Sequence, residues 1–131
     1  MLTGAHVVIY SRDAEADRRF FANTLGFHSV DAGQGWLIFG LPAAEVAFHP
    51  HDNNNQHEMF LVCDNLKTQM AALEKKGVHF GEIGEERWGI RTTISLPGGG
   101  KIGLYEPTHP VTFGKAGRVR KRIKATRSKR R

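Results

Sequence analysis

Residues 57–78 read HEMFLVCDNLKTQMAALEKKGV, an apolar strand pattern that runs into an amphipathic helix pattern and ends near a glycine. Residues 6–27 read HVVIYSRDAEADRRFFANTLGF and follow the same order. The opening histidines, His6 and His57, differ by 51 positions, and so do the glycines that end the two helix patterns. Because self-similarity at a fixed spacing marks a duplicated structural unit, the chain is predicted to fold from two copies of one module.

Each module is predicted to contain a strand, a helix and three further strands. In the first module, residues 1–50, a helix begins at Asp13 and the strands are expected at residues 5–11, 28–31, 36–39 and 45–49. In the second module, residues 57–110, a helix is expected at 66–76 and the strands at residues 57–63, 79–83, 90–96 and 101–106. Helices on one side of each sheet leave the other side open. The predicted fold is therefore α+β, with two tandem βαβββ modules whose curved mixed sheet forms a trough.

The length and the charge distribution indicate one domain and a separate tail. A chain of 131 residues has the usual size of a single domain, expected here at residues 1–114. Ten of the 19 Lys and Arg residues lie in residues 115–131, which contain no acid. A block of like charge with few apolar residues is expected to be a mobile, solvated extension. The alternative is an arm that binds nucleic acid or anionic lipid through its charge.

The composition favours a soluble, cytoplasmic protein with no membrane association. No apolar run approaches the roughly 20 residues that span a bilayer, and the amino terminus has no basic-then-apolar leader. The single cysteine, Cys63, cannot form an internal disulfide. Its place in an apolar strand favours a buried, unreactive thiol over a nucleophile.

Strand alternation predicts which polar residues share the trough. If Val7 and Ile9 lie under the first helix, the alternation of the strand turns His6 to the open side of the sheet. By the same alternation, the second module would place His57, Met59 and Leu61 on the open side and Phe60 under its helix. The two opening histidines are then equivalent positions of the two modules.

A candidate metal site follows from the matched positions. The ends of the two modules pair His49 with Glu106. Together with His6 and His57, they give three imidazoles and one carboxylate. Such a set suits a borderline divalent transition metal, Fe, Ni, Zn, Co or Mn, better than Ca or Mg. His49 and Glu106 are also the candidate catalytic groups, with His49 either a fourth ligand or a general acid/base.

Two further residues are candidates for contact with a small-molecule substrate. Arg91 lies in the strand expected at 90–96, where it could orient an anionic substrate. Trp88, or alternatively Trp36, could supply an apolar wall of the site.

The chain resembles the vicinal oxygen chelate superfamily, which comprises glyoxalases, fosfomycin- and bleomycin-resistance proteins and extradiol dioxygenases. The resemblance covers about residues 1–110 and rests on TGAH at 3–6, TLGF at 24–27, His57 and GGKIGLYEP at 99–107. It implies paired βαβββ modules and a divalent metal held by His6, His57 and Glu106. It also implies a homodimer, because single-domain members often build the site from two chains. His49 departs from the carboxylate that glyoxalase I enzymes use at that place.

These observations support three hypotheses of different classes. The leading one is a metal-dependent enzyme, either a glyoxalase-like lyase or isomerase or a dioxygenase, that acts on a small oxygen-rich substrate. The alternative is a metal-free protein of the bleomycin-resistance type that binds and sequesters a small ligand. The third is an interaction protein whose basic tail binds nucleic acid.

Overall fold

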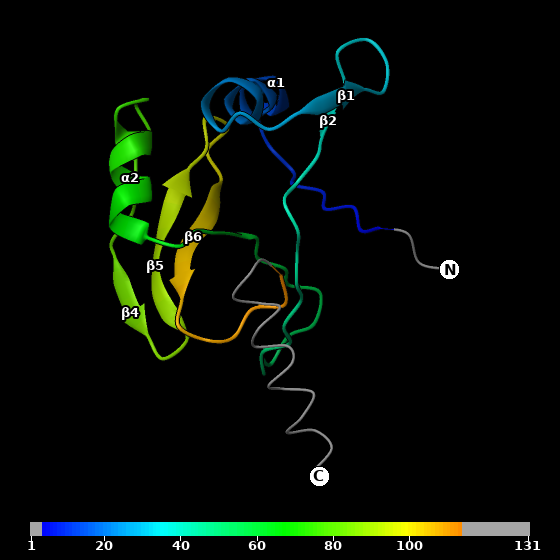
Figure 1. The fold of residues 1–131 in the computed structure, drawn as a ribbon. Helices are drawn as coiled ribbons and strands as arrows, with labels where there is room; N and C mark the ends of the chain where they lie inside the picture. The colour runs from blue at the N-terminus through cyan, green and yellow to red at the C-terminus, as the bar shows by residue number, and fades with distance from the viewer. Residues whose placement is uncertain (1–3, 114–131) are drawn as a thin grey trace.

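A computed structural model describes residues 4–113 of the protein (Figure 1). The first half contains α1 (Ala14–Arg19), the π-helix η1 (Phe20–Thr24), β1 (Ser29–Asp31) and β2 (Leu37–Phe39). The second half contains β3 (Phe60–Val62), α2 (Leu66–Glu74), β4 (Gly84–Glu86), β5 (Gly89–Ser95) and β6 (Lys101–Pro107). The basic tail lies outside these described residues. Within them, no helix is long and apolar enough to cross a membrane.

The second half forms a four-stranded sheet. Its order is β3-β6-β5-β4, with β3 parallel to β6 and the other neighbours antiparallel. The β5–β6 hairpin runs from Gly89 opposite Pro107 to Ser95 opposite Lys101. α2 lies against one face of this sheet (Figure 1). The predicted order of one strand, one helix and three strands is thus confirmed for this module.

The strand expected at residues 79–83 is displaced along the chain. Phe80 makes an isolated bridge with Ile94, and the regular strand β4 begins only at Gly84. Gly81 lies so close to β5 that a side chain at this position would collide with the hydroxyl of Thr93. The segment at residues 80–81 therefore contacts β5 closely before the regular pairing of β4 with β5 begins.

The hydrophobic core lies between the helices and the sheet. Leu66 of α2, Ile94 of β5 and Leu104 of β6 are at most 2% exposed. Burial of each such side chain contributes about 1.5–3 kcal/mol. Phe21 of η1 joins the same core and packs its ring against Phe39, with ring centroids 5.6 Å apart. The first half is therefore anchored to the second by its helix.

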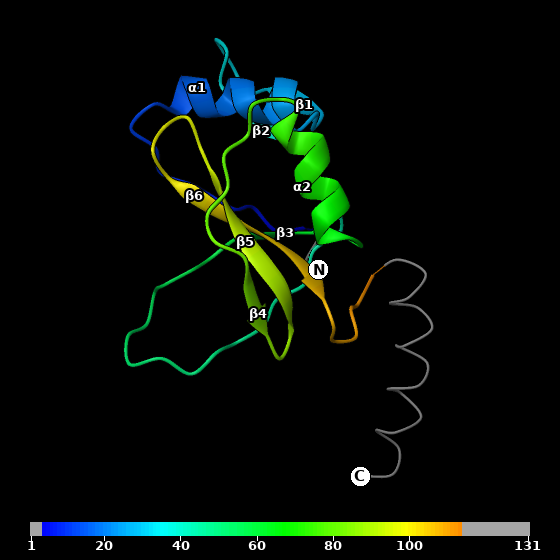
Figure 2. The same cartoon turned by 90° about the vertical axis from the view of Figure 1, so that its left-hand side faces the viewer.

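The first half pairs fewer strands than the sequence predicts. Only β1 and β2 pair, as a separate two-stranded sheet, and the strands expected at 5–11 and 45–49 do not form. These two segments are irregular and exposed, and residues 41–56 run as a long irregular stretch (Figure 2). Val8 is 60% exposed and Phe48 is 91% exposed. Among residues 4–113, no strand pairs with either segment, and a strand needs such a neighbour for its hydrogen bonds.

The two helical regions have similar N-caps but differ in length by one residue. Asp13 and Asn65 are the N-caps, and each side chain accepts a hydrogen bond of 3.0 Å from the backbone N–H three residues later. These caps, at positions 13 and 65, differ by 52 positions, whereas Gly26 and Gly77 differ by 51. The π-helix η1, with its Leu25 N–H donating to the Phe20 carbonyl, accommodates the extra residue.

Candidate functional site

The four-stranded sheet has one face under the helices and one face turned away from them. In β6, Ile102 and Leu104 are buried in the core, so Gly103 and Tyr105 point to the opposite face. In β5, Arg91 is the register partner of Tyr105 and shares this opposite face. We call it the open face, and it is the side of the sheet on which the trough was predicted.

The orientation of β3 is opposite to the prediction. Met59 and Leu61 pack against the core. Phe60 lies over Gly103 of the open face, where its ring would collide with any side chain at position 103. The placement of Met59 and Leu61 on the open side is therefore wrong. The pattern alone could not orient this strand because its residues are apolar on both faces.

The helix caps identify the true counterpart of His6. His6 lies seven residues before the cap Asp13, and Glu58 lies seven residues before the cap Asn65. Glu58 also alternates with Phe60, so the continued strand direction places it on the open-face side. Glu58 is thus equivalent to His6. The equivalence of His57 with His6 assumed a spacing of 51 between the two modules. That spacing applies only to residues after η1, whereas the residues before it are related by 52.

Three aromatic rings dominate the open face. Phe60, Trp88 and Tyr105 pack edge to face, with centroid distances of 5.9 Å for Phe60–Trp88, 5.3 Å for Phe60–Tyr105 and 5.2 Å for Trp88–Tyr105. Such geometry is favoured by the ring quadrupoles and holds each ring in a fixed orientation. We call these three residues the aromatic trio. Trp88, a predicted substrate contact, lies in it, in the turn between β4 and β5.

His109 is joined to the aromatic trio by a hydrogen bond. Its Nε2 lies 3.1 Å from the Tyr105 hydroxyl, and its Nδ1 lies 2.7 Å from the Pro110 carbonyl oxygen. A carbonyl oxygen only accepts, so Nδ1 carries a proton and donates it to the Pro110 carbonyl oxygen. Burial, followed by the charge of Glu45, raises the pKa of Tyr105 and keeps its hydroxyl a donor. No pattern in the sequence points to this role, since His109 lies in a loop.

Arg91 places a cation on the open face, as expected. Its guanidinium donates to the Glu86 carboxylate from Nη2 at 3.0 Å and from Nε at 3.2 Å. Both side chains are more than a third exposed. An exposed pair of this kind is worth roughly 0.2–1 kcal/mol, so the guanidinium is readily available to another anion.

The predicted metal ligands do not come together within one chain. His6, His49 and His57 are exposed and lie outside the strands. Glu106 alternates with Leu104 and lies on the helix side, where its Oε1 accepts a hydrogen bond of 2.9 Å from the Leu66 N–H. Among residues 4–113, no group of three or more His, Cys, Asp and Glu side chains could hold a metal ion. As a donor set from a single chain, these residues do not fit a metal.

Cys63 is not poised for nucleophilic chemistry. Burial, followed by the charges of Glu106 and Asp64, raises the pKa of its thiol to about 11. Its Sγ lies 3.5 Å from the Tyr105 carbonyl oxygen. The thiol therefore stays protonated at neutral pH, and nucleophilic attack requires the thiolate.

No protein-family model and no curated protein matches the sequence, but solved structures match the fold. TnmS3, an antibiotic binding protein from Streptomyces sp. CB03234, is 24% identical with a TM-score of 0.58, over 82% of this chain and 100% of its own. Lactoylglutathione lyase from Agrobacterium tumefaciens is 13% identical with a TM-score of 0.58, over 79% and 92%. A glyoxalase/bleomycin resistance protein from Streptomyces sp. CB03234 is 24% identical with a TM-score of 0.53, over 74% and 94%. The chain shares the fold of these proteins.

This shared fold is the one that the resemblance implied, and it confirms the α+β class predicted from the sequence. At these identities the likeness extends to the fold alone. Its neighbours include both a glyoxalase enzyme and an antibiotic binding protein, so the fold is compatible with catalysis and with simple binding. The choice between them must come from the residues of this chain.

Proposed function

We propose that the protein binds and sequesters a small planar aromatic ligand on the open face of its sheet. The observation that carries this proposal is the aromatic trio, three oriented rings beside a cation. The carboxylate expected to hold a metal, Glu106, lies on the other face in a hydrogen bond to the Leu66 N–H. The proposed function corresponds to the second hypothesis from the sequence, a metal-free protein that binds a small ligand.

The chemistry of the open face suits a flat ring that carries an acidic group. Trp88 is half-buried, and its indole offers part of its surface for contact with an added ring. An aromatic contact contributes about 0.5–1.5 kcal/mol beyond the area that it buries. Arg91 would pair with a carboxylate or phenolate of the ligand in exchange for Glu86. The antibiotic binding protein TnmS3 shares this fold, which supports a binding role for the present chain.

A homodimer belongs to this proposal. The segments at 5–11 and 45–49 form no strand, and they expose Val7, Val8, Val46 and Phe48 by 54–91%. Exposed apolar side chains on strand-like segments favour pairing with another chain. A second copy would supply the strands that these segments lack and would extend the open face into a closed trough. The proposed setting is the cytoplasm.

Calorimetric titration with 9-anthracenecarboxylate tests the binding role. Trp88→Ala should weaken binding about three- to tenfold, because it removes one ring contact of about 0.5–1.5 kcal/mol. The matched control is Trp36→Ala, since Trp36 lies in the first half and is 62% exposed. Circular dichroism would establish that both variants fold. Equal affinity in the Trp88 variant and the unaltered protein would count against the open face as the binding site.

A metal-dependent enzyme of the glyoxalase or dioxygenase type is the second candidate. The observation in its favour is the equivalence of His6 and Glu58, a histidine and a carboxylate at matched positions of the two modules. In a dimer, His6 of one copy could approach Glu58 of the other. With His49 added, such a donor set would suit Fe, Ni, Zn, Co or Mn, which would act as a Lewis acid toward an oxygen-rich substrate.

Elemental analysis of the purified full chain separates the two candidates. The enzyme hypothesis predicts about one transition metal per chain that is lost in His6→Ala and Glu58→Gln but retained in His57→Gln. The binding hypothesis predicts that 9-anthracenecarboxylate binds with the same affinity before and after treatment with a chelator.

A further inference from the structure

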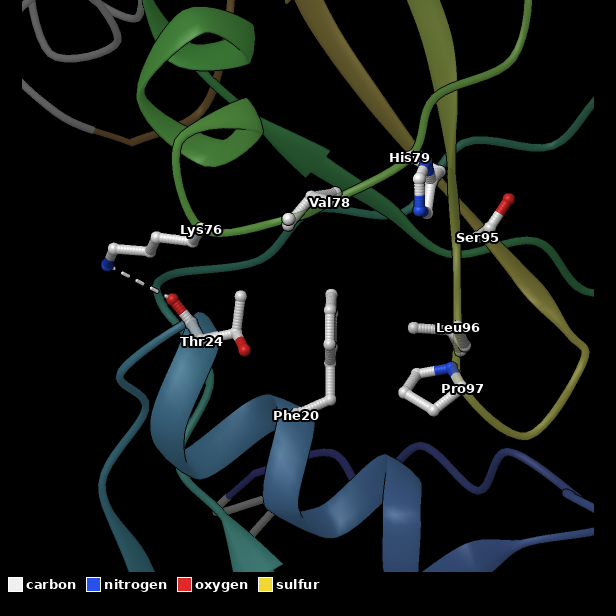
Figure 3. A pocket seen from close by; sticks show the side chains of 9 residues that line it. Phe20, Thr24, Lys76, Val78, His79, Ser95, Leu96 and Pro97 are labelled. Atoms are coloured by element: carbon white, nitrogen blue, oxygen red, sulfur yellow. Dashed lines mark hydrogen bonds between the residues drawn. The ribbon is translucent and has the colours of Figure 1, made fainter.

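A hollow lies at the end of β5, where the two halves of the chain meet (Figure 3). Its volume is about 240 Å³, and its walls come from η1, the segment after α2 and the end of β5. A protein cavity of about 150 Å³ accommodates benzene. The hollow therefore has room for one ring, or a branched chain of similar size, with a short substituent.

The inner walls of this hollow are apolar. Val78 and Leu96 are each 5% exposed, and both line it. The Phe20 ring stands in the hollow between Thr24 and Pro97 (Figure 3). A compact apolar group placed here would contact an aromatic ring and aliphatic side chains that the fold already holds in place.

The rim of the hollow carries positive charge and no negative side chain. Lys76 and His79 lie at its two ends, with Ser95 beside His79 (Figure 3). No Asp or Glu is among its lining residues. Lys76 Nζ donates to the Thr24 carbonyl oxygen at 3.2 Å. An ammonium group has three donors, and this bond uses one of them, so the remaining donors can serve a ligand.

We infer that this hollow binds a small carboxylate that carries one aromatic ring or a compact branched chain. The apolar walls accept the ring or chain, and the carboxylate is placed at the rim to accept hydrogen bonds from Lys76. A cation would be repelled by Lys76, and a neutral molecule would leave the ammonium without a charged partner. The site is separate from the open face, because it lies at the end of β5 beside η1 and shares no residue with the aromatic trio.

The test is a ¹H–¹⁵N NMR titration with 3-phenylpropanoate and its neutral analogue 3-phenyl-1-propanol. The resonances of Lys76 to His79 and of Ser95 and Leu96 should shift and saturate with the carboxylate. Lys76→Gln should weaken carboxylate binding about three- to fivefold, the effect of an exposed ion pair of up to about 1 kcal/mol, and should leave the alcohol unaffected. Lys75→Gln is the matched control, since Lys75 is the neighbouring exposed lysine and does not line the hollow.

Two variants distinguish this hollow from the open face. Thr24→Phe places a ring in the hollow from its half-exposed rim and should abolish the probe-induced shifts of Lys76 to His79, Ser95 and Leu96. Trp88→Ala should leave these shifts unchanged, because Trp88 does not line the hollow. Loss of these shifts in Trp88→Ala, equal effects of Lys75→Gln and Lys76→Gln, or no saturable shift of these resonances at up to 50 mM probe would each overturn the inference.

Discussion

Replacement of Glu106 should destabilise the folded protein whether or not a metal is present. The Glu106 carboxylate accepts a 2.9 Å hydrogen bond from Leu66, the first residue of α2, whose side chain is only 1% exposed. A hydrogen bond to a charged group is worth about 1.5–3 kcal/mol, and the negative charge also stabilises the helix N-terminus by roughly 0.3–1 kcal/mol. Because Glu106 is half-buried, we expect Glu106→Ala to lower the free energy of unfolding by about 2 kcal/mol.

Urea and thermal denaturation, followed by circular dichroism, measure this loss. For a domain of this size, about 2 kcal/mol corresponds to a fall of about 8 °C in Tm. Glu106→Gln keeps an acceptor and removes the charge, so about half of the loss is expected. Glu85→Ala is the matched control, because Glu85 is an exposed residue of β4, and its effect should stay within about 0.5 kcal/mol. A loss in Glu106→Ala that vanishes when EDTA is added would refute the helix-capping role and support metal ligation.

Four further outcomes can be checked on the purified protein. Gly103→Ala should cost about 1–3 kcal/mol in urea denaturation because the new methyl group meets the Phe60 ring, and an unchanged midpoint would contradict that contact. Asp17→Ala should cost about 1–2 kcal/mol in the same assay because the Gly98 N–H loses its acceptor at 2.7 Å, while Asp17→Asn should cost less. Burial and neighbouring carboxylates raise the pKa of Cys63 from 9.0 to about 11, so mass spectrometry should detect much slower alkylation at pH 8 in the folded protein than in urea. As pH rises, the thiol ionises in the unfolded chain before it ionises in the folded protein. Its contribution to the free energy of unfolding is therefore full below about pH 9 and is lost as pH rises toward 11. A urea midpoint that rises over this pH range would contradict the burial.

The second module could be predicted from the sequence because its signals are local and its partners lie in the same chain. Asn65 caps α2 and Gly77 ends the helical region with φ of 84°, as the pattern indicates. The first module has signals of the same kind, and its helix start at Asp13 is confirmed. The pattern alone could not show that its outer strands fail to form, since a strand needs a neighbour and segment 5–11 pairs with none in the described part of the chain.

The candidate site could be predicted only in part. The placement of Arg91 on the open face follows from alternation against the buried Thr92 and Ile94, and the structure agrees. Alternation failed for Met59 and Leu61 because apolar residues on both faces carry no information on direction. The contact of His109 with Tyr105 depends on how a loop folds back over the sheet. No periodicity in the sequence encodes such a contact.

The π-helix η1 has a consequence for how this chain can change in length. A helix tolerates one extra residue by widening a single turn, and the hydrogen bonds resume beyond it. A strand cannot do the same, because a shift by one residue turns every following side chain to the other face of the sheet. The extra residue between Phe20 and Thr24 therefore leaves both faces of the sheet intact, whereas an extra residue in β6 would exchange Tyr105 for a core residue. Variation in length among descendants of this chain should accumulate in its helices and loops, and the strands should keep their lengths.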